Sequence, residues 1–147
     1  MPSAALRVAG IDPGLNATGY GILDFHPGKI ALVEAGVVRT STKQPLAERL
    51  SLLHQELAAV FQEFQPDAVS VEEVYSHYAH PRTAVLMAHA RGVALLAAAD
   101  RGIAVHSYGA TLIKRAVSGS GKASKQLIQA AVQQRLGLSA LPEPSDV

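Results

Sequence analysis

The chain has 147 residues, no cysteine and a formal net charge of +1, and 48% of its residues are hydrophobic. This length suits one domain with a sizeable core, and the composition excludes a disordered chain, disulfides and thiolate metal sites. No apolar run approaches the ~20 residues of a membrane span, and the N-terminus lacks a secretion signal. We therefore expect a soluble, cytoplasmic protein without a membrane partner, organised as a single domain over residues 1–147.

Three strands and a helix are predicted in the first half of the chain. Apolar runs at residues 6–11, 20–25 and 29–40 predict the strands, and the short turns between them indicate an antiparallel meander. Apolar residues then recur every three or four positions between Leu46 and Phe64, which predicts an amphipathic helix that Pro66 ends.

The second half alternates between strands and helices. Residues 68–74 predict a strand that follows a helix and so runs parallel to the first strand. Residues 83–100 predict a helix that is apolar nearly all round, and residues 102–108 predict the last strand. Two more helices are expected at 110–117 and 124–136. The fold class is therefore α/β: a mixed five-stranded sheet with an antiparallel hairpin edge and parallel strands, covered by helices.

The net charge hides an asymmetry along the chain. Residues 1–73 hold five Lys or Arg against nine Asp or Glu, a net of −4. Residues 74–125 hold seven Lys or Arg against Asp100 alone, a net of +6. An acidic part joined to a basic part is typical of an enzyme that binds a metal and a polyanion, and the alternative is ordinary solvated surface charge.

Carboxylates stand at the ends of two predicted strands. Asp12 precedes the turn at Pro13-Gly14, where it suits either a turn or a metal site, and Glu72 and Glu73 end the strand at 68–74. Adjacent side chains of a strand point to opposite faces, so at most one glutamate shares a face with its neighbours. If the two strands are parallel, Asp12 and one glutamate meet at the edge where open α/β sheets bind ligands. The alternative is two exposed glutamates at a frayed strand end.

A third carboxylate, Asp146, follows Pro144-Ser145 in a pattern typical of a helix start. On the residues alone, Asp146 is better explained as a helix-capping acid than as a metal ligand. Three such carboxylates would nevertheless suit Mg²⁺ or Mn²⁺, and two ions about 4 Å apart can support phosphodiester cleavage. The stretch GSGKAS lacks the first glycine and the Ser/Thr of a P-loop and follows a helix, so we reject that interpretation.

Five motifs in fixed order carry a family resemblance: GIDPG, TGYG, QPDAVSVEEVY, ARGVALLAA and KRAVSGSGKASKQ. Together they resemble the RuvC family of bacterial Holliday junction resolvases over residues 6–146. The resemblance implies a ribonuclease H-like fold and a homodimer that resolves four-way DNA junctions in recombination and repair. It also implies paired, symmetric hydrolysis that uses Mg²⁺, or Mn²⁺ in its place, with two ions per site, and a branch-migration motor as partner.

The resemblance also assigns roles to the carboxylates. Asp12, Glu72 and Asp146 are similar to the first three metal-binding catalytic carboxylates of the family, and Glu73 stands where the family often has Gln. The family's fourth carboxylate lies three residues beyond Asp146, at a position that this chain does not reach. We therefore expect the nuclease domain to lack the end of its C-terminal helix. A protein that binds junctions without cutting them remains an alternative for that reason.

Further residues are expected to contact DNA. Tyr75 resembles an aromatic residue that lies near the junction centre, where it could stack on a base, with loop packing as the alternative for Tyr75 and Tyr78. Lys114 and Lys125 resemble the family's basic residues near the site, and Lys125 is also expected to stabilise transition-state charge. The remaining predicted DNA contacts are Arg115, Lys122, Gly119 and Gly121.

Two other interpretations carry less weight. Actin-like ATPases and sugar kinases have a related fold and an Asp-x-Gly hairpin, but they need a second such domain that 147 residues cannot supply. His77 and His80 are spaced like half of a zinc site without a second pair, so we expect them in a surface loop. The helix around Arg91 resembles the family's dimer-forming segment.

Overall fold

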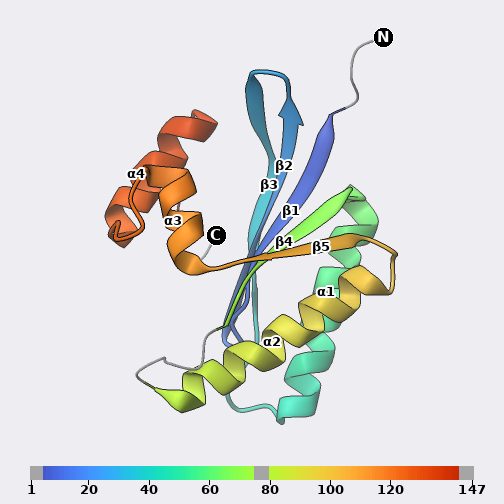
Figure 1. Ribbon diagram of the computed structural model, residues 1–147. Coiled ribbons are helices and arrows are strands. Elements are labelled where there is room, and N and C mark those ends of the chain that lie inside the picture. Colours follow the sequence, from blue (N-terminus) through green and yellow to red (C-terminus); the bar gives the residue numbers. More distant parts are fainter. Residues whose placement is uncertain (1–4, 75–79, 143–147) are drawn as a thin grey trace.

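The computed structural model describes residues 5–74 and 80–142. Figure 1 shows the order of the elements, which is the order predicted from the sequence. Their bounds are β1 Leu6–Asp12, β2 Ala17–His26, β3 Lys29–Arg39, α1 Leu46–Phe64, β4 Ala68–Glu72, α2 Pro81–Ala99, β5 Ala104–Tyr108, α3 Ala110–Ser118 and α4 Lys125–Leu136. The predicted elements are confirmed, with boundaries that differ by a few residues.

The five strands form one mixed sheet in the order β3-β2-β1-β4-β5. β2 is antiparallel to both β1 and β3, whereas β4 is parallel to both β1 and β5. The predicted antiparallel hairpin edge and parallel remainder are therefore confirmed. Since β1, β4 and β5 run in the same direction, their last residues lie along one edge of the sheet, which we call the carboxyl edge.

The hydrophobic core lies on one face of this sheet. Alternating residues of β1 and β4 are buried there, and they pack against buried side chains of α1 and α2. The strand residues concerned are Ala9, Ile11, Val69 and Val71. The helices α3 and α4 lie on the other side of the sheet, as Figure 1 shows, and no side chain within either of them is buried.

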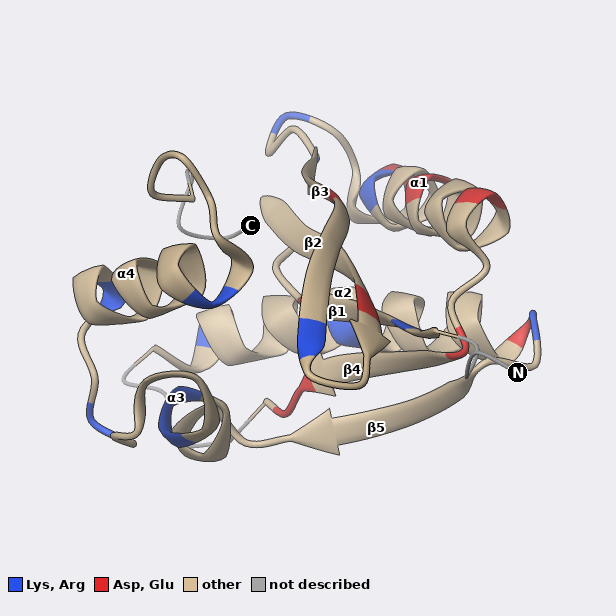
Figure 2. Cartoon of the chain, turned by 90° about the horizontal axis from the view of Figure 1, so that it is seen from above, with Lys and Arg blue, Asp and Glu red and all other residues tan. Residues whose placement is uncertain are grey.

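Charge distinguishes α1 from the helices α3 and α4, whereas α2 carries Arg82 and Arg91 and no acid. Figure 2 shows acidic positions along α1 and basic positions on α3, on α4 and in the turn that joins them. The sequence from residue 101 to residue 142 contains no Asp or Glu. In the described ranges, no helix combines the length and the apolar character that a membrane span requires.

Candidate metal and nucleic-acid site

Two predicted carboxylates lie on neighbouring strands at the carboxyl edge. β1 and β4 pair in parallel up to Ile11 and Val71, and the next step of this register sets Asp12 beside Glu72. Because Ile11 and Val71 are buried on the core face, alternation places Asp12 and Glu72 on the opposite face, the side of α3 and α4. The strand ends that carry Asp12 and Glu72 are therefore adjacent, as expected, and the role of both residues as metal ligands stays a prediction.

The sheet surface around Asp12 is made largely of glycine. Across the β1–β2 pair, Asp12 lies opposite Gly19, and Gly10 lies opposite Gly21. A Cβ atom added at Gly10 or at Gly21 would meet no other atom within 4 Å. This part of the sheet therefore leaves open space beside the carboxylates, in which a phosphate group could be accommodated.

The environment of Glu72 favours a cation. The side chain is half-buried, and this desolvation raises the pKa of the Glu72 carboxyl, while the positive charge of Lys114 on α3 partly opposes the shift. A carboxylate that has lost hydration without full compensation gains most from a nearby divalent ion. Of the predicted basic residues, Lys114 thus acts electrostatically on Glu72.

The donor set fits a hard divalent ion. Mg²⁺ commonly takes one or two protein carboxylates and completes its coordination with water and substrate phosphate oxygens. Within residues 5–74 and 80–142, no three His, Asp or Glu side chains gather as a metal cluster. The predicted third ligand, Asp146, lies outside the described residues.

Arg91 of α2 holds the end of β4 in place. Its Nε donates to the backbone carbonyl of Glu72 at 3.3 Å, and its Nη2 donates to Oγ of Ser107 on β5 at 2.6 Å. The backbone N–H of Glu73 also donates to the carbonyl of Tyr108, at 2.9 Å. The backbone that carries Glu72 is therefore attached to both α2 and β5.

The sequence patterns indicated Arg91 only as one of the positive charges and as part of a segment that resembles a dimer-forming helix. A signal was nevertheless available, since Arg91 is the one charged residue between His89 and Ala99 of an otherwise apolar helix. A charged side chain in such a position needs a polar partner within the fold.

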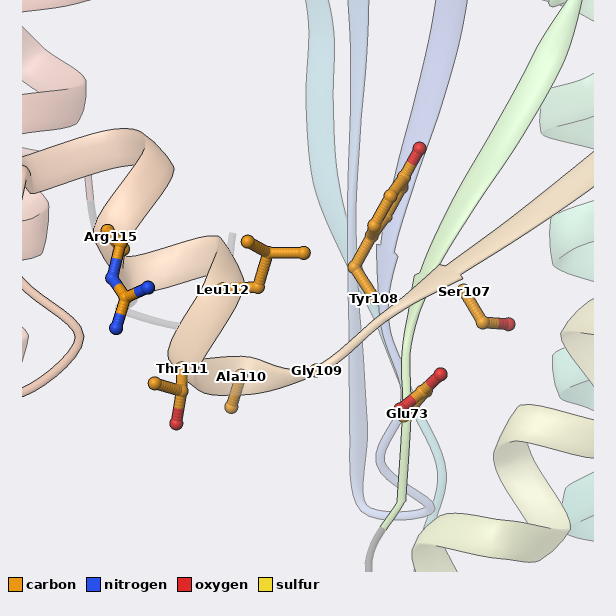
Figure 3. Close-up of a pocket in the computed structure, with 8 residues that line it drawn as sticks. All are labelled: Glu73, Ser107, Tyr108, Gly109, Ala110, Thr111, Leu112 and Arg115. Carbon is orange, nitrogen blue, oxygen red and sulfur yellow. The ribbon is translucent and has the colours of Figure 1, made fainter.

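Glu73 faces a different space from Glu72. It lines a cavity of about 580 Å³ beside the site, shown in Figure 3, and neither Asp12 nor Glu72 contributes to its wall. The other lining residues are Ser107, Tyr108, Gly109, Ala110, Thr111, Leu112 and Arg115. In Figure 3, Glu73 lies at the end of the strand and Arg115 lies on α3, at the two sides of this space.

The predicted DNA-binding residues lie on the basic layer where the structure describes them. Lys114 and Arg115 are on α3, Lys122 is in the following turn, and Lys125 begins α4; all four are exposed. Tyr75 lies outside the described residues, as do Tyr78 and His77, while the exposed His80 precedes α2 as its N-cap.

The two predicted glycine contacts have structural roles of their own. Gly119 ends α3 in the left-handed region, with φ of 84°. A Cβ added at Gly121 would come within 2.7 Å of Cγ2 of Thr111, so Gly121 allows the turn to pack against α3. These roles explain both glycines within the fold, and their contact with DNA stays a prediction.

Comparison with known proteins gives a consistent family. The family model described as crossover junction endodeoxyribonuclease RuvC matches residues 8–147. A relative of that name from Rhodopirellula baltica is 44% identical over 146 residues, which cover 99% of this chain and 82% of the relative. Another from Fusobacterium nucleatum is 39% identical over 141 residues, which cover 96% of this chain and 74% of the relative.

Solved structures agree with the sequence relatives. The structure of Thermus thermophilus RuvC in complex with Holliday junction substrate is similar, with a TM-score of 0.89 and 36% identity over 96% of this chain and 86% of that chain. The yeast mitochondrial Holliday junction resolvase Ydc2 has a TM-score of 0.63 at 12% identity, over 92% of this chain and 67% of that chain, which shows a shared fold. The predicted ribonuclease H-like architecture is confirmed, and the chain belongs to the RuvC family of crossover junction endodeoxyribonucleases.

Proposed function

We propose that this chain is a structure-selective endonuclease that resolves four-way DNA junctions during recombination and repair. The observation that carries the proposal is the placement of Asp12 and Glu72 side by side at the carboxyl edge, on the face of the sheet where the basic helices lie. The similarity to Thermus thermophilus RuvC, which was solved with a Holliday junction substrate, supports the choice of DNA.

We assign the metal site to Asp12, Glu72 and Asp146, with Mg²⁺ as the metal, Mn²⁺ as its substitute and two ions per site. The chemistry that such ions supply is activation of a water and stabilisation of the leaving oxygen of a phosphodiester. The protein contributes a fixed arrangement of oxygen ligands, because Arg91 anchors the backbone of Glu72. In the proposal, Lys125 adds positive charge where negative charge develops on the phosphate.

The DNA is bound by the basic layer and recognised by a dimer. Lys114, Arg115, Lys122 and Lys125 would neutralise backbone phosphates, and Tyr75 would stack on a base. A second copy of the chain would cover the outer side of α2, where Val85 and Leu96 are both more than half exposed. Two sites in one dimer would then give paired, symmetric cuts. A branch-migration motor as partner and a cytoplasmic location belong to the same proposal.

The test is a cleavage assay on a labelled synthetic four-way junction beside a linear duplex of the same arms. We expect symmetric nicks in the junction alone, with Mg²⁺ or Mn²⁺ and not with EDTA. Asp12→Asn should lower the cutting rate more than about a hundredfold, because even residues that merely orient metal ligands contribute about 10–100-fold. Junction binding in EDTA should survive this change.

Asp100→Asn is the matched control, since Asp100 is exposed just beyond α2, at the opposite edge of the sheet. It should cut like the unchanged protein. An unchanged chain that neither binds nor cuts the junction would overturn the proposed function. Binding without metal-dependent nicks would contradict the nuclease activity, and an Asp12→Asn protein that still cuts would contradict Asp12 as a metal ligand.

A further inference from the structure

The loop that follows Asp12 is held by a buried arginine. Arg49 of α1 is only 8% exposed, and its Nε donates to Oγ1 of Thr40 at 2.9 Å. The Thr40 hydroxyl in turn donates to the backbone carbonyl of Leu15, and Nη2 of Arg49 donates to Oδ1 of Asn16 at 2.6 Å. Residues 13–16 are thus fixed at the carboxyl edge, directly after Asp12.

This contact determines which way the Asn16 amide is turned. A guanidinium group carries five N–H donors and no acceptor, so Asn16 has to present its carbonyl oxygen to Arg49. The Nδ2 amide group, with two donors, is then directed away from Arg49 on a side chain that is exposed. The loop therefore presents an oriented pair of hydrogen-bond donors at the same edge as Asp12.

Holding Arg49 does not by itself require an amide. A carboxylate at position 16 would give the buried guanidinium a charged partner and a stronger, charge-assisted hydrogen bond. It would also add a negative charge to the carboxyl edge, along which we expect the DNA strand to lie. An asparagine retains the contact with Arg49 and faces the solvent with donors only.

The surroundings of the loop are compatible with an anion. Ala17 pairs with the exposed Arg39 at the end of β3, and the exposed Lys43 follows a few residues later. Apart from Asp12 itself, the acidic residues nearest to them in sequence are Glu34 on β3 and Glu48 in the first turn of α1. A DNA strand carries one phosphate per about 3.4 Å of helix axis, so a strand bound at Asp12 brings further phosphates along this edge.

We propose that Nδ2 of Asn16 donates to a backbone phosphate of the bound DNA strand, next to the phosphate at Asp12 and Glu72. This contact rests on the proposed function. It would help to place the strand over the carboxylates without reading its sequence, as phosphate contacts do. Asn16 was not among the residues that the sequence motifs indicated.

The substitution Asn16→Asp separates this role from a structural one. It keeps an oxygen for Arg49 and replaces the donors by a charged oxygen. We expect an unchanged or higher urea midpoint, together with roughly tenfold weaker binding of a labelled four-way junction, since a charge-assisted hydrogen bond is lost and repulsion is added. Binding is measured in EDTA, so that a new carboxylate cannot act through metal.

Gln62→Glu is the matched control, because it makes the same change of charge at an exposed position in the last turn of α1, far along the helix from Arg49. It should bind the junction like the unchanged protein. Equal weakening by both variants, or normal binding by Asn16→Asp, would overturn the contact.

A second variant covers the case in which Asn16→Asp unfolds. Asn16→Ala, compared at a temperature at which it is folded, should also bind more weakly, and unchanged binding would overturn the contact. A chain without any substitution that fails to bind the junction would overturn the proposed function instead, so the two failures are distinguishable.

Discussion

The two helical layers of this protein differ in what they contribute to it. The layer of α1 and α2 buries large side chains such as Leu53, Leu57 and Phe61, along with a row of alanines, against the sheet. The layer of α3 and α4 buries no side chain within its helices and carries basic residues without a single acid. One layer therefore stabilises the fold, and the other presents charge.

The carboxylates lie where the two layers meet at the sheet. Packing of α1 and α2 against β1 and β4 sets the strand register, and this register brings Asp12 beside Glu72. Lys114 of the other layer then acts on Glu72 through its charge. Substitutions in the two layers should accordingly separate stability from DNA binding.

The largest effect is expected in the core layer. Leu57→Ala should lower the free energy of unfolding by about 3 kcal/mol, because Leu57 is fully buried and its removal leaves a cavity. Leu127→Ala on α4 is the matched change, at a side chain that is 49% exposed, and it should cost less than about 1 kcal/mol. Urea unfolding measures both values, and similar losses would remove the distinction between the layers.

The next effect concerns the charged layer. Lys114→Met should weaken junction binding about tenfold and reduce the slope of log affinity against log salt concentration by about 1, as expected for one lost phosphate contact. The urea midpoint should hardly change, since Lys114 is exposed. A salt titration of binding measures the slope.

The control for this prediction is Lys29→Met. Lys29 is exposed at the turn between β2 and β3, which lies at the edge opposite to Asp12, and it carries the same charge. It should leave affinity and salt slope as they are. An equal loss for both lysines would mean that net charge, and not the position of α3, determines binding.

Much of this arrangement could be predicted from the sequence. The apolar periodicity changes from strand-like to helix-like at the correct positions, and a strand that follows a helix was expected to be parallel to β1. That expectation was enough to predict that Asp12 and the glutamates lie at the same edge of the sheet. The alternation rule could not choose between Glu72 and Glu73, because the choice depends on which residues of β4 face the core.

Other parts of the site depend on contacts that leave no local pattern. Arg91 and Arg49 each reach from a helix to a backbone or a side chain far away in sequence, and no spacing rule indicates such partners. The glycines at 119 and 121 were predicted as DNA contacts, yet a left-handed helix end and a close approach to Thr111 explain them within the fold.

The smallest effect concerns the pH dependence of stability, and it tests the link between the layers. Burial raises the pKa of Glu72 above its ordinary value, so the folded protein holds this proton more tightly than the unfolded chain does. The resulting stabilisation is complete below the ordinary pKa of glutamate, and it is lost as the pH rises through the raised value. In EDTA at neutral pH, Glu72→Gln should therefore be slightly more stable than the unchanged protein, by no more than roughly a few tenths of a kcal/mol, because solvent screens a carboxylate that is only half-buried.

Adding Mg²⁺ should reverse this order, because an ion that binds only the folded state stabilises it, and the unchanged carboxylate binds the ion better than an amide does. Urea midpoints measured at about pH 4–8, with and without Mg²⁺, test both the pH dependence and the effect of the metal. Glu73→Gln is the matched control, since Glu73 lines a separate cavity, and it should keep the full response to Mg²⁺. If Glu72→Gln and Glu73→Gln respond alike to Mg²⁺, Glu72 is not a metal ligand, although the strand register sets it beside Asp12. The metal would then have to be held by other residues at this edge.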